Sequence, residues 1–344
     1  MIRVLVAEDS LTARQLLVDL LSTDPDVRVV GEAKDGAEAV GLAVDLKPSL
    51  IVMDVHMPAV DGLAATKEIM VRSPTPIILV SATANPLDVE LALNAMRAGA
   101  LMVVAKPDDP ASSTFDARRD QLLRMIKAMA EVKVVRRWAP RAQPPAGQAP
   151  WSKPAAATRL VAIAGSTGGP AVLQRILADL PGDFAPPILA VQHIATGFVQ
   201  GLAEWLNASS SLRVKVAEDG EVLEPHVAYL APDGRHLGAR APGCVDLSAT
   251  PPLGGFRPSG TYLFESAARL RGPAVAAVIL TGMGSDGVAG LHQVREAGGT
   301  VLAQDEQSSV VYGMPQEAVA AGVVHAVLGV EEIAPRLVEL AREA

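Results

Sequence analysis

The sequence is poor in cysteine, in long apolar runs and in basic residues, and each shortage excludes a class of protein. The one cysteine, Cys244, excludes an internal disulfide and any zinc site built from several cysteines. The longest apolar run, residues 318–330, is interrupted by Gly322 and His325 and falls short of the ~20 residues that span a membrane. Lys and Arg number 30 against 38 Asp and Glu, and this net charge of −8 argues against nucleic acid or an anionic membrane as the main partner.

The amino-terminal segment also lacks the pattern of a secretory signal. Residues 1–7 pass directly into a strand-like run, without a basic region that is followed by an apolar region and a cleavage site. We therefore expect a cytoplasmic protein with no direct membrane insertion.

The composition is that of a globular protein with room for two domains. Hydrophobic residues make up 49% of the 344 residues and charged residues 20%, which excludes disorder as the main state. Five alternations of a short apolar run and an amphipathic stretch open the chain, and such βα units predict an α/β fold with a doubly wound parallel sheet. The expected strands are residues 3–7, 27–30, 50–53, 77–80 and 101–105, and the expected helices are residues 11–22, 36–47, 62–71, 87–97 and 114–131.

A Pro/Ala-rich linker is predicted over residues 132–157. Acidic residues are missing there, whereas basic residues and five prolines remain. This composition favours a semi-extended, solvated segment, and the alternative is an irregular segment packed between two domains.

Residues 158–344 are predicted to form a second α/β domain, doubly wound and mostly parallel. Short apolar runs again alternate with amphipathic stretches, with more Gly and Pro in the loops. The expected strands are residues 160–164, 188–191, 212–216, 226–230, 274–280 and 301–303, and the expected helices are residues 169–180, 197–209, 262–271 and 286–297.

Polar residues stand at the carboxyl ends of four strands expected in the first domain. Glu8 and Asp9 follow the first strand, Asp54 the third, Ser81 the fourth and Lys106 the fifth. Each alone would be an ordinary loop residue, but ligands bind at this edge of open parallel sheets. Three carboxylates repel one another unless a cation lies among them, and all-oxygen ligands suit Mg²⁺. Asp54 could then attack a phosphoryl donor, with Lys106 and the Ser81 hydroxyl binding the phosphoryl oxygens.

This pattern closely resembles the receiver domain of bacterial response regulators, over the first 125 residues. The resemblance implies a flavodoxin-like (βα)5 fold in which Asp54 accepts the phosphoryl group and Glu8 and Asp9 hold the metal with it. We expect His56, in the loop after Asp54, to offer its backbone carbonyl to the same metal. Val103 departs from the family pattern, since receivers usually carry an aromatic residue three positions before the lysine.

Three strand ends in the second domain carry a serine, a histidine and an aspartate. Ser166 lies in a Gly-Ser-Thr-Gly-Gly-Pro turn that opens a helix, where the helix dipole favours developing negative charge. His193 follows another strand, and Asp286 opens a helix after a third. The turn fits neither the GxGxxG nor the P-loop pattern of a nucleotide-binding loop. Taken alone, Ser166 and Asp286 could be N-caps, and His193 could be structural. Together they predict a hydrolytic triad.

The second domain resembles the catalytic domain of the chemotaxis protein-glutamate methylesterase (CheB) family. The serine turn, a Gln-His pair, a Leu-Thr-Gly-Met-Gly-Ser-Asp-Gly run and a Val-Tyr-Gly-Met-Pro run carry the resemblance. It implies that Ser166 is the nucleophile, His193 the general base and Asp286 the residue that orients the imidazole. It also implies that the Met283 backbone N–H is an oxyanion-hole donor and that Thr167 supports the histidine by a hydrogen bond.

The resemblance implies hydrolysis of glutamate methyl esters on methyl-accepting chemoreceptors, with release of methanol, and deamidation of receptor glutamines. A chemotaxis histidine kinase would supply the phosphoryl group, with Mg²⁺ needed for that step and no cofactor for ester hydrolysis. Two alternatives stay open: a receiver-controlled docking protein without turnover, and a general small-molecule serine esterase.

Overall fold

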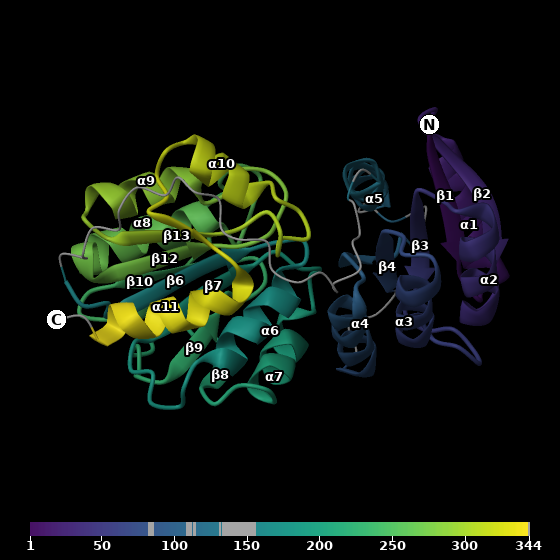
Figure 1. Ribbon diagram of the computed structural model, residues 1–344. Coiled ribbons are helices and arrows are strands. Elements are labelled where there is room, and N and C mark those ends of the chain that lie inside the picture. The colour runs from purple at the N-terminus through teal and green to yellow at the C-terminus, as the bar shows by residue number, and fades with distance from the viewer. Residues whose placement is uncertain (82–85, 108–111, 113–114, 131, 133–155, 343–344) are drawn as a thin grey trace. The chain divides into compact units, whose positions relative to one another are not determined.

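The structure is a computed structural model of the chain, shown in Figure 1. It describes all residues except 82–85, 108–111, 113–114, 131, 133–155 and 343–344. The chain divides into two compact units, Met1–Ala142 and Gln143–Ala344. The linker predicted over residues 132–157 lies almost wholly outside the described residues.

The first unit is a five-stranded parallel sheet in the order β2-β1-β3-β4-β5. Its strands are β1 (Ile2–Ala7), β2 (Val27–Ala33), β3 (Leu50–Asp54), β4 (Ile77–Ser81) and β5 (Met102–Ala105). Its helices are α1 (Leu11–Ser22), α2 (Gly36–Leu46), α3 (Gly62–Arg72), α4 (Pro86–Ala98) and α5 (Phe115–Met129). Strands β3 and β4 are buried along their whole length, as expected of central strands covered on both faces.

The strand order fixes where this unit can bind a ligand. The chain steps from β1 outward to β2 and then crosses back to β3 on the other side of β1. Right-handed connections therefore put α1 on one face of the sheet and α2, α3 and α4 on the other. The crevice at this reversal lies at the carboxyl ends of β1 and β3, next to Glu8 and Asp54.

The second unit is a seven-stranded parallel sheet in the order β14-β13-β12-β6-β7-β9-β8 with a separate antiparallel pair, β10-β11. Its strands are β6 (Leu160–Gly165), β7 (Ile188–Gln192), β8 (Arg213–Val216), β9 (Val227–Leu230), β10 (His236–Arg240), β11 (Cys244–Ser248), β12 (Val275–Ile279), β13 (Thr300–Gln304) and β14 (Ala326–Leu328). Its helices are α6 (Gly169–Asp179), α7 (Val199–Asn207), α8 (Gly260–Arg271), the short 3₁₀ helix η1 (Gly272–Ala274), α9 (Val288–Glu296), α10 (Met314–Ala320) and α11 (Val330–Arg342).

Helices cover both faces of this second sheet (Figure 1). Apolar side chains of β6, β7 and β12 pack with α8, α9, α10 and the β10-β11 pair in one continuous core, whereas α6, α7 and α11 lie on the opposite face. The strand order reverses between β6 and β12, so the carboxyl ends of these central strands again mark the crevice.

The predicted fold class is confirmed for both units, but six elements of the second were not predicted from the sequence: β10, β11, β14, η1, α10 and α11. Strand β14 has three residues and α10 has seven, too few for a periodic pattern to stand out. Helix α11 contains Pro335, a residue that normally ends a helical pattern.

Helices α8 and α9 pack unusually close at the end of α8 that faces the crevice. A Cβ atom on Gly290 of α9 would lie 2.5 Å from the backbone oxygen of Thr261 and 2.8 Å from the Cβ of Phe264. Only glycine lets the two backbones approach so far, and this approach brings the loop before α9 against the first turn of α8.

Replacing Gly290 with alanine should destabilise the second unit by about 1–3 kcal/mol, because the added methyl group must push α8 and α9 apart. Calorimetry of the full chain measures this change. Gly41 in α2 is the control, since a Cβ there meets nothing within 4 Å. Gly41→Ala should stabilise the first unit by about 0.4–1 kcal/mol. If the second unit of a Gly290→Ala chain unfolds at no lower temperature than in the wild type, the close packing of α8 and α9 is contradicted.

Candidate functional site

The carboxylate of Asp286 lies at the amino terminus of α8, where it accepts three hydrogen bonds. The Ser259 hydroxyl donates to Oδ1 at 2.7 Å, the Gly260 N–H donates to Oδ2 at 2.6 Å, and the Thr261 N–H donates to Oδ1 at 3.2 Å. Thr261 returns the contact, because its hydroxyl accepts the N–H of Gly287 at 2.9 Å. A carboxylate at this position satisfies backbone donors that the first turn of a helix cannot pair internally.

These contacts keep Asp286 ionised although its side chain is buried. Burial alone would raise the pKa of this carboxyl group, but hydrogen bonds from His193, Ser259 and Gly260 outweigh it and lower the pKa below its usual value. Asp286 is therefore a fixed negative charge beside the histidine.

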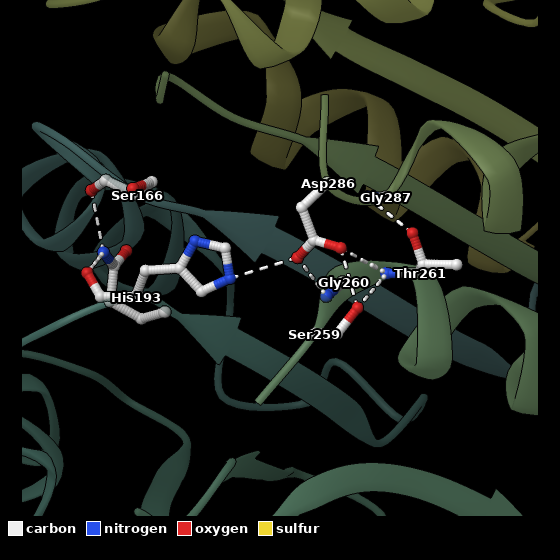
Figure 2. Close-up of polar contacts among 8 residues, drawn as sticks. Ser166, His193, Ser259, Gly260, Thr261, Asp286 and Gly287 are labelled. Atoms are coloured by element: carbon white, nitrogen blue, oxygen red, sulfur yellow. Dashed lines mark hydrogen bonds and ion pairs between the residues drawn. The ribbon is translucent and has the colours of Figure 1, made fainter. Parts of the chain in front are cut away.

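The imidazole of His193 lies between Ser166 and Asp286, as Figure 2 shows. Its Nε2 atom is 3.1 Å from Asp286 Oδ2, and its side chain is only 13% exposed. Because the carboxylate can only accept, this contact favours the neutral ring with its proton on Nε2, and that form has a free lone pair on Nδ1. Both ring nitrogens are buried, and neither makes a hydrogen bond of good geometry within the described part of the chain, so the Nε2 contact with Asp286 is an ion-pair distance only.

Ser166 follows β6 directly and precedes α6, and its backbone is tied to both neighbouring strands. Its N–H donates to the backbone oxygen of Thr281 beyond β12, at 3.0 Å. Its own backbone oxygen accepts the N–H of Gly169 at 2.8 Å and the side-chain amide of Gln192 at 2.7 Å. The same Gln192 amide also donates to the backbone oxygen of His193 at 2.9 Å, so one side chain connects the serine and histidine backbones.

The imidazole has no hydrogen bond to either of the nearby hydroxyl groups in the described structure. Among the described residues, neither the Ser166 hydroxyl nor the Thr167 side chain bonds to the imidazole. Thr167 instead uses its backbone oxygen, which accepts the Thr281 hydroxyl at 2.9 Å. Catalytic hydrogen bonds often tighten only when substrate is bound, so a serine beside a histidine remains a competent arrangement. The supporting role of Thr167 stays a prediction.

Met283 lies in the loop after β12, which packs against the serine turn. A Cβ atom on the preceding Gly282 would lie 2.7 Å from the Ser166 Cβ, so the two loops touch. Two backbone hydrogen bonds hold Gly282 in place. Its N–H donates to the backbone oxygen of Val311, and its backbone oxygen accepts the N–H of Met314. The Met283 N–H donates to no backbone oxygen in the described structure and is available for an oxyanion.

The first unit brings Glu8, Asp9, Asp54 and Lys106 together at the ends of β1, β3 and β5. One carboxylate oxygen from each acidic residue lies within 4.8 Å of the others. Lys106 Nζ is 2.7 Å from Glu8 Oε2 and 2.8 Å from Asp54 Oδ2. Glu8, Asp54 and Lys106 are buried, whereas Asp9 is exposed.

The buried charged groups of this cluster change one another's pKa values. Burial, the largest effect, and the nearby charge of Asp54 raise the pKa of the Glu8 carboxyl group, against the lowering effect of Lys106. Burial would lower the pKa of the Lys106 ammonium group, but its two carboxylate partners raise it. The cluster thus holds a lysine that stays charged and a carboxylate that resists ionisation.

The other predicted receiver residues lie around this cluster. Ser81 ends β4, and its backbone oxygen accepts the Lys106 N–H at 2.8 Å. The His56 imidazole contacts the buried Asp88 carboxylate of α4, and the role of its backbone carbonyl stays a prediction. Val103 is buried in β5.

Both units match known families. Residues 161–337 match the CheB methylesterase model, and residues 4–113 match the response regulator receiver domain. Protein-glutamate methylesterase/protein-glutamine glutaminase 4 of Myxococcus xanthus is 54% identical to this chain, over 98% of this chain and 96% of its own length. The chain belongs to the CheB methylesterase family. Protein-glutamate methylesterase/protein-glutamine glutaminase 3 of Anaeromyxobacter dehalogenans is 51% identical to this chain, over 98% of this chain and 98% of its own length.

A solved structure of the CheB family supports the fold of the second unit. The crystal structure of the Thermotoga maritima CheB methylesterase catalytic domain is 40% identical in sequence and has a TM-score of 0.52. It covers 54% of this chain and 100% of that domain. These relatives confirm the predicted enzyme class, and neither the docking protein nor the general esterase finds support among them. Every helix in the described residues is too short or too polar to span a bilayer.

The sequence reading missed several residues of the CheB-type site. Ser259, Gly260 and Phe256 all contact the histidine or the aspartate but are not predicted from the sequence, and Gln192 enters there only as part of the Gln-His pair. Ser259 carried a usable signal, because a serine before a helical pattern is a preferred N-cap. Phe256 carried none, since its ring meets His193 across more than sixty positions of the chain.

The donor chemistry of the receiver cluster fits Mg²⁺. Hard divalent cations take carboxylate oxygens, and three carboxylates around one lysine carry more negative charge than Lys106 balances. Glu8, Asp9 and Asp54 would hold the ion, which would neutralise the carboxylates and the oxygens of an incoming phosphoryl group.

Glu8→Gln should make the first unit more stable than the wild type at pH 7. A carboxyl group with a raised pKa stabilises the fold only while it is protonated, and that contribution is lost as the pH rises through its folded-state pKa. The two chains should therefore be about equally stable near pH 4 and diverge above it. Calorimetry across this pH range, without divalent cations, measures the difference.

The exposed neighbour provides the control for this experiment. Asp9→Asn should change the stability by no more than about 0.5 kcal/mol at either pH, as is usual for a surface substitution. A Glu8→Gln chain that is less stable than the wild type at pH 7 would show that the Lys106 contact outweighs the burial of Glu8.

Proposed function

We propose that this CheB-family chain hydrolyses methyl esters of glutamate side chains on chemoreceptors and releases methanol. The observation that supports it best is the contact between His193 and the ionised Asp286, beside a serine at the end of β6. The relatives' name includes a protein-glutamine glutaminase, and we extend that second activity, the conversion of receptor glutamine to glutamate, to this chain.

The reaction starts with acyl transfer to Ser166. The Ser166 Oγ attacks the ester carbonyl carbon while Nδ1 of His193 takes the hydroxyl proton. The Met283 N–H donates to the oxygen that becomes negative, and Asp286 stabilises the imidazolium through Nε2. The intermediate collapses, the bond to the methoxy oxygen breaks, and His193 returns the proton so that methanol leaves.

Water completes the cycle by the same route. The water oxygen attacks the carbonyl carbon of the acyl-serine while His193 accepts a proton from that water. His193 then gives this proton to the Ser166 oxygen as the serine leaves, and the product is the glutamate side chain. An amide substrate follows the same two steps with ammonia as the leaving group, which explains how one site serves both esters and glutamines.

The receiver would control this activity through Asp54. A chemotaxis histidine kinase supplies the phosphoryl group, Mg²⁺ assists its transfer, and Lys106 and Ser81 bind the phosphoryl oxygens. Added negative charge at a domain surface can change its contacts by a few kcal/mol, enough to regulate access of a receptor to Ser166. Such control in the cytoplasm gives the methylation system negative feedback for adaptation.

Ser166→Ala should reduce methanol release from methylated receptor by about 10³-fold or more, because no other hydroxyl replaces the nucleophile. The exposed Ser209 after α7 provides the control, and Ser209→Ala should keep the wild-type rate. A folded Ser166→Ala chain with more than a tenth of the wild-type rate would contradict the assignment.

The same assay separates the alternatives. A docking protein without turnover would release no methanol even as the wild type, and a general esterase would hydrolyse p-nitrophenyl esters without preferring the methylated receptor.

A further inference from the structure

The ring of Phe256 stacks on the catalytic imidazole. The ring centroids of Phe256 and His193 are 4.4 Å apart, and the ring planes differ by 9°. The contact therefore covers one face of the imidazole with a parallel aromatic ring, in an orientation that constrains the plane of the histidine.

A tight turn holds Phe256 in this place. Leu253 and Phe256 exchange two backbone hydrogen bonds, of 3.1 and 2.9 Å, across Gly254 and Gly255. Both glycines have positive φ angles, 58° and 88°, and a Cβ on either would meet nothing within 4 Å. The glycines are thus required for the backbone shape of the turn and not for space.

The base of the turn is also fixed. The Arg257 guanidinium donates to the backbone oxygens of Ala249 at 3.1 Å and Thr250 at 3.2 Å. Two residues later the chain reaches Ser259, which binds Asp286. One continuous segment, residues 256–259, therefore contacts both His193 and Asp286.

The stacking contact with Phe256 restrains the imidazole in a way that its contact with Asp286 alone does not. The contact of Nε2 with the Asp286 carboxylate, at 3.1 Å, is one point of attachment, about which the ring can still turn. Both ring nitrogens are buried, and Nδ1 has no partner in the described structure that would stop such a turn. A planar ring stacked on the imidazole face opposes rotation out of its plane and makes no hydrogen bond to Nδ1.

We propose that Phe256 is a positioning residue for the general base. It keeps the imidazole in the plane in which Nε2 faces Asp286 and Nδ1 is free to accept the proton of Ser166. Phe256 touches no reacting atom in this role and acts only through His193. The proposal rests on the hydrolytic function proposed above.

The central variant is Phe256→Leu, which keeps the apolar volume but removes the flat ring. It should lower kcat on methylated receptor by about tenfold or more, since small misplacements of a catalytic group are costly, and leave KM within about twofold. Phe256→Tyr keeps the ring and should retain most of the activity. Leu253→Ala changes a partly exposed side chain of the same turn and should leave both constants unchanged.

A spectroscopic measurement tests the positioning without any activity. Histidine-selective ¹⁵N NMR of the full chain should show the His193 ring in one neutral form with its proton on Nε2, and a mixture of forms in Phe256→Leu. The His193 signals are assigned with His193→Gln. If wild-type protein releases no methanol but gives this NMR result, the proposed function fails and the positioning role stands.

Three outcomes would overturn the positioning role. The first is an unchanged kcat in Phe256→Leu, and the second is a raised KM with unchanged kcat, which would make Phe256 a substrate contact. The third is equal loss of kcat in Phe256→Tyr and Phe256→Leu, because the ring would then not matter. A melting temperature measured for each variant ensures that these comparisons are made between folded chains.

Discussion

The catalytic unit depends on one interaction, the binding of the Asp286 carboxylate by the amino terminus of α8. The first turn of a helix has N–H groups without internal partners, and a buried carboxylate needs donors, so each satisfies the other. The same contacts keep the carboxylate charged next to His193. Gly290 permits the close approach of α8 and α9 on which this geometry rests.

The two units use the same edge of a parallel sheet with opposite electrostatics. In the first, three carboxylates gather around one lysine and leave an excess of negative charge that a cation would relieve. In the second, the charge of Asp286 is fully compensated by N–H and O–H donors, so the site needs no cation to hold it. One topology therefore supports phosphoryl chemistry in one unit and acyl chemistry in the other.

Much of this arrangement could be predicted from the sequence, because topology alone brings strand ends together. Glu8, Asp54 and Lys106 end three strands of one sheet, and the structure places their charged atoms within hydrogen-bond distance. The contacts of side chains could not be predicted in the same way. Which imidazole nitrogen faces Asp286 depends on side-chain rotation, which no sequence pattern sets. The turn that carries Phe256 has no hydrophobic period, so its partner is visible only in three dimensions.

The most direct test of the account is the rate of methanol release by an Asp286→Asn chain. The asparagine amide would place N–H donors where the carboxylate now accepts, either against the Gly260 N–H and His193 Nε2 or against the Thr261 N–H. Facing Nε2, it would move the ring proton to Nδ1, where the imidazole could no longer accept from Ser166. A folded chain should then lose about 10³-fold or more in kcat. A rate within tenfold of the wild type would contradict the central role of this carboxylate.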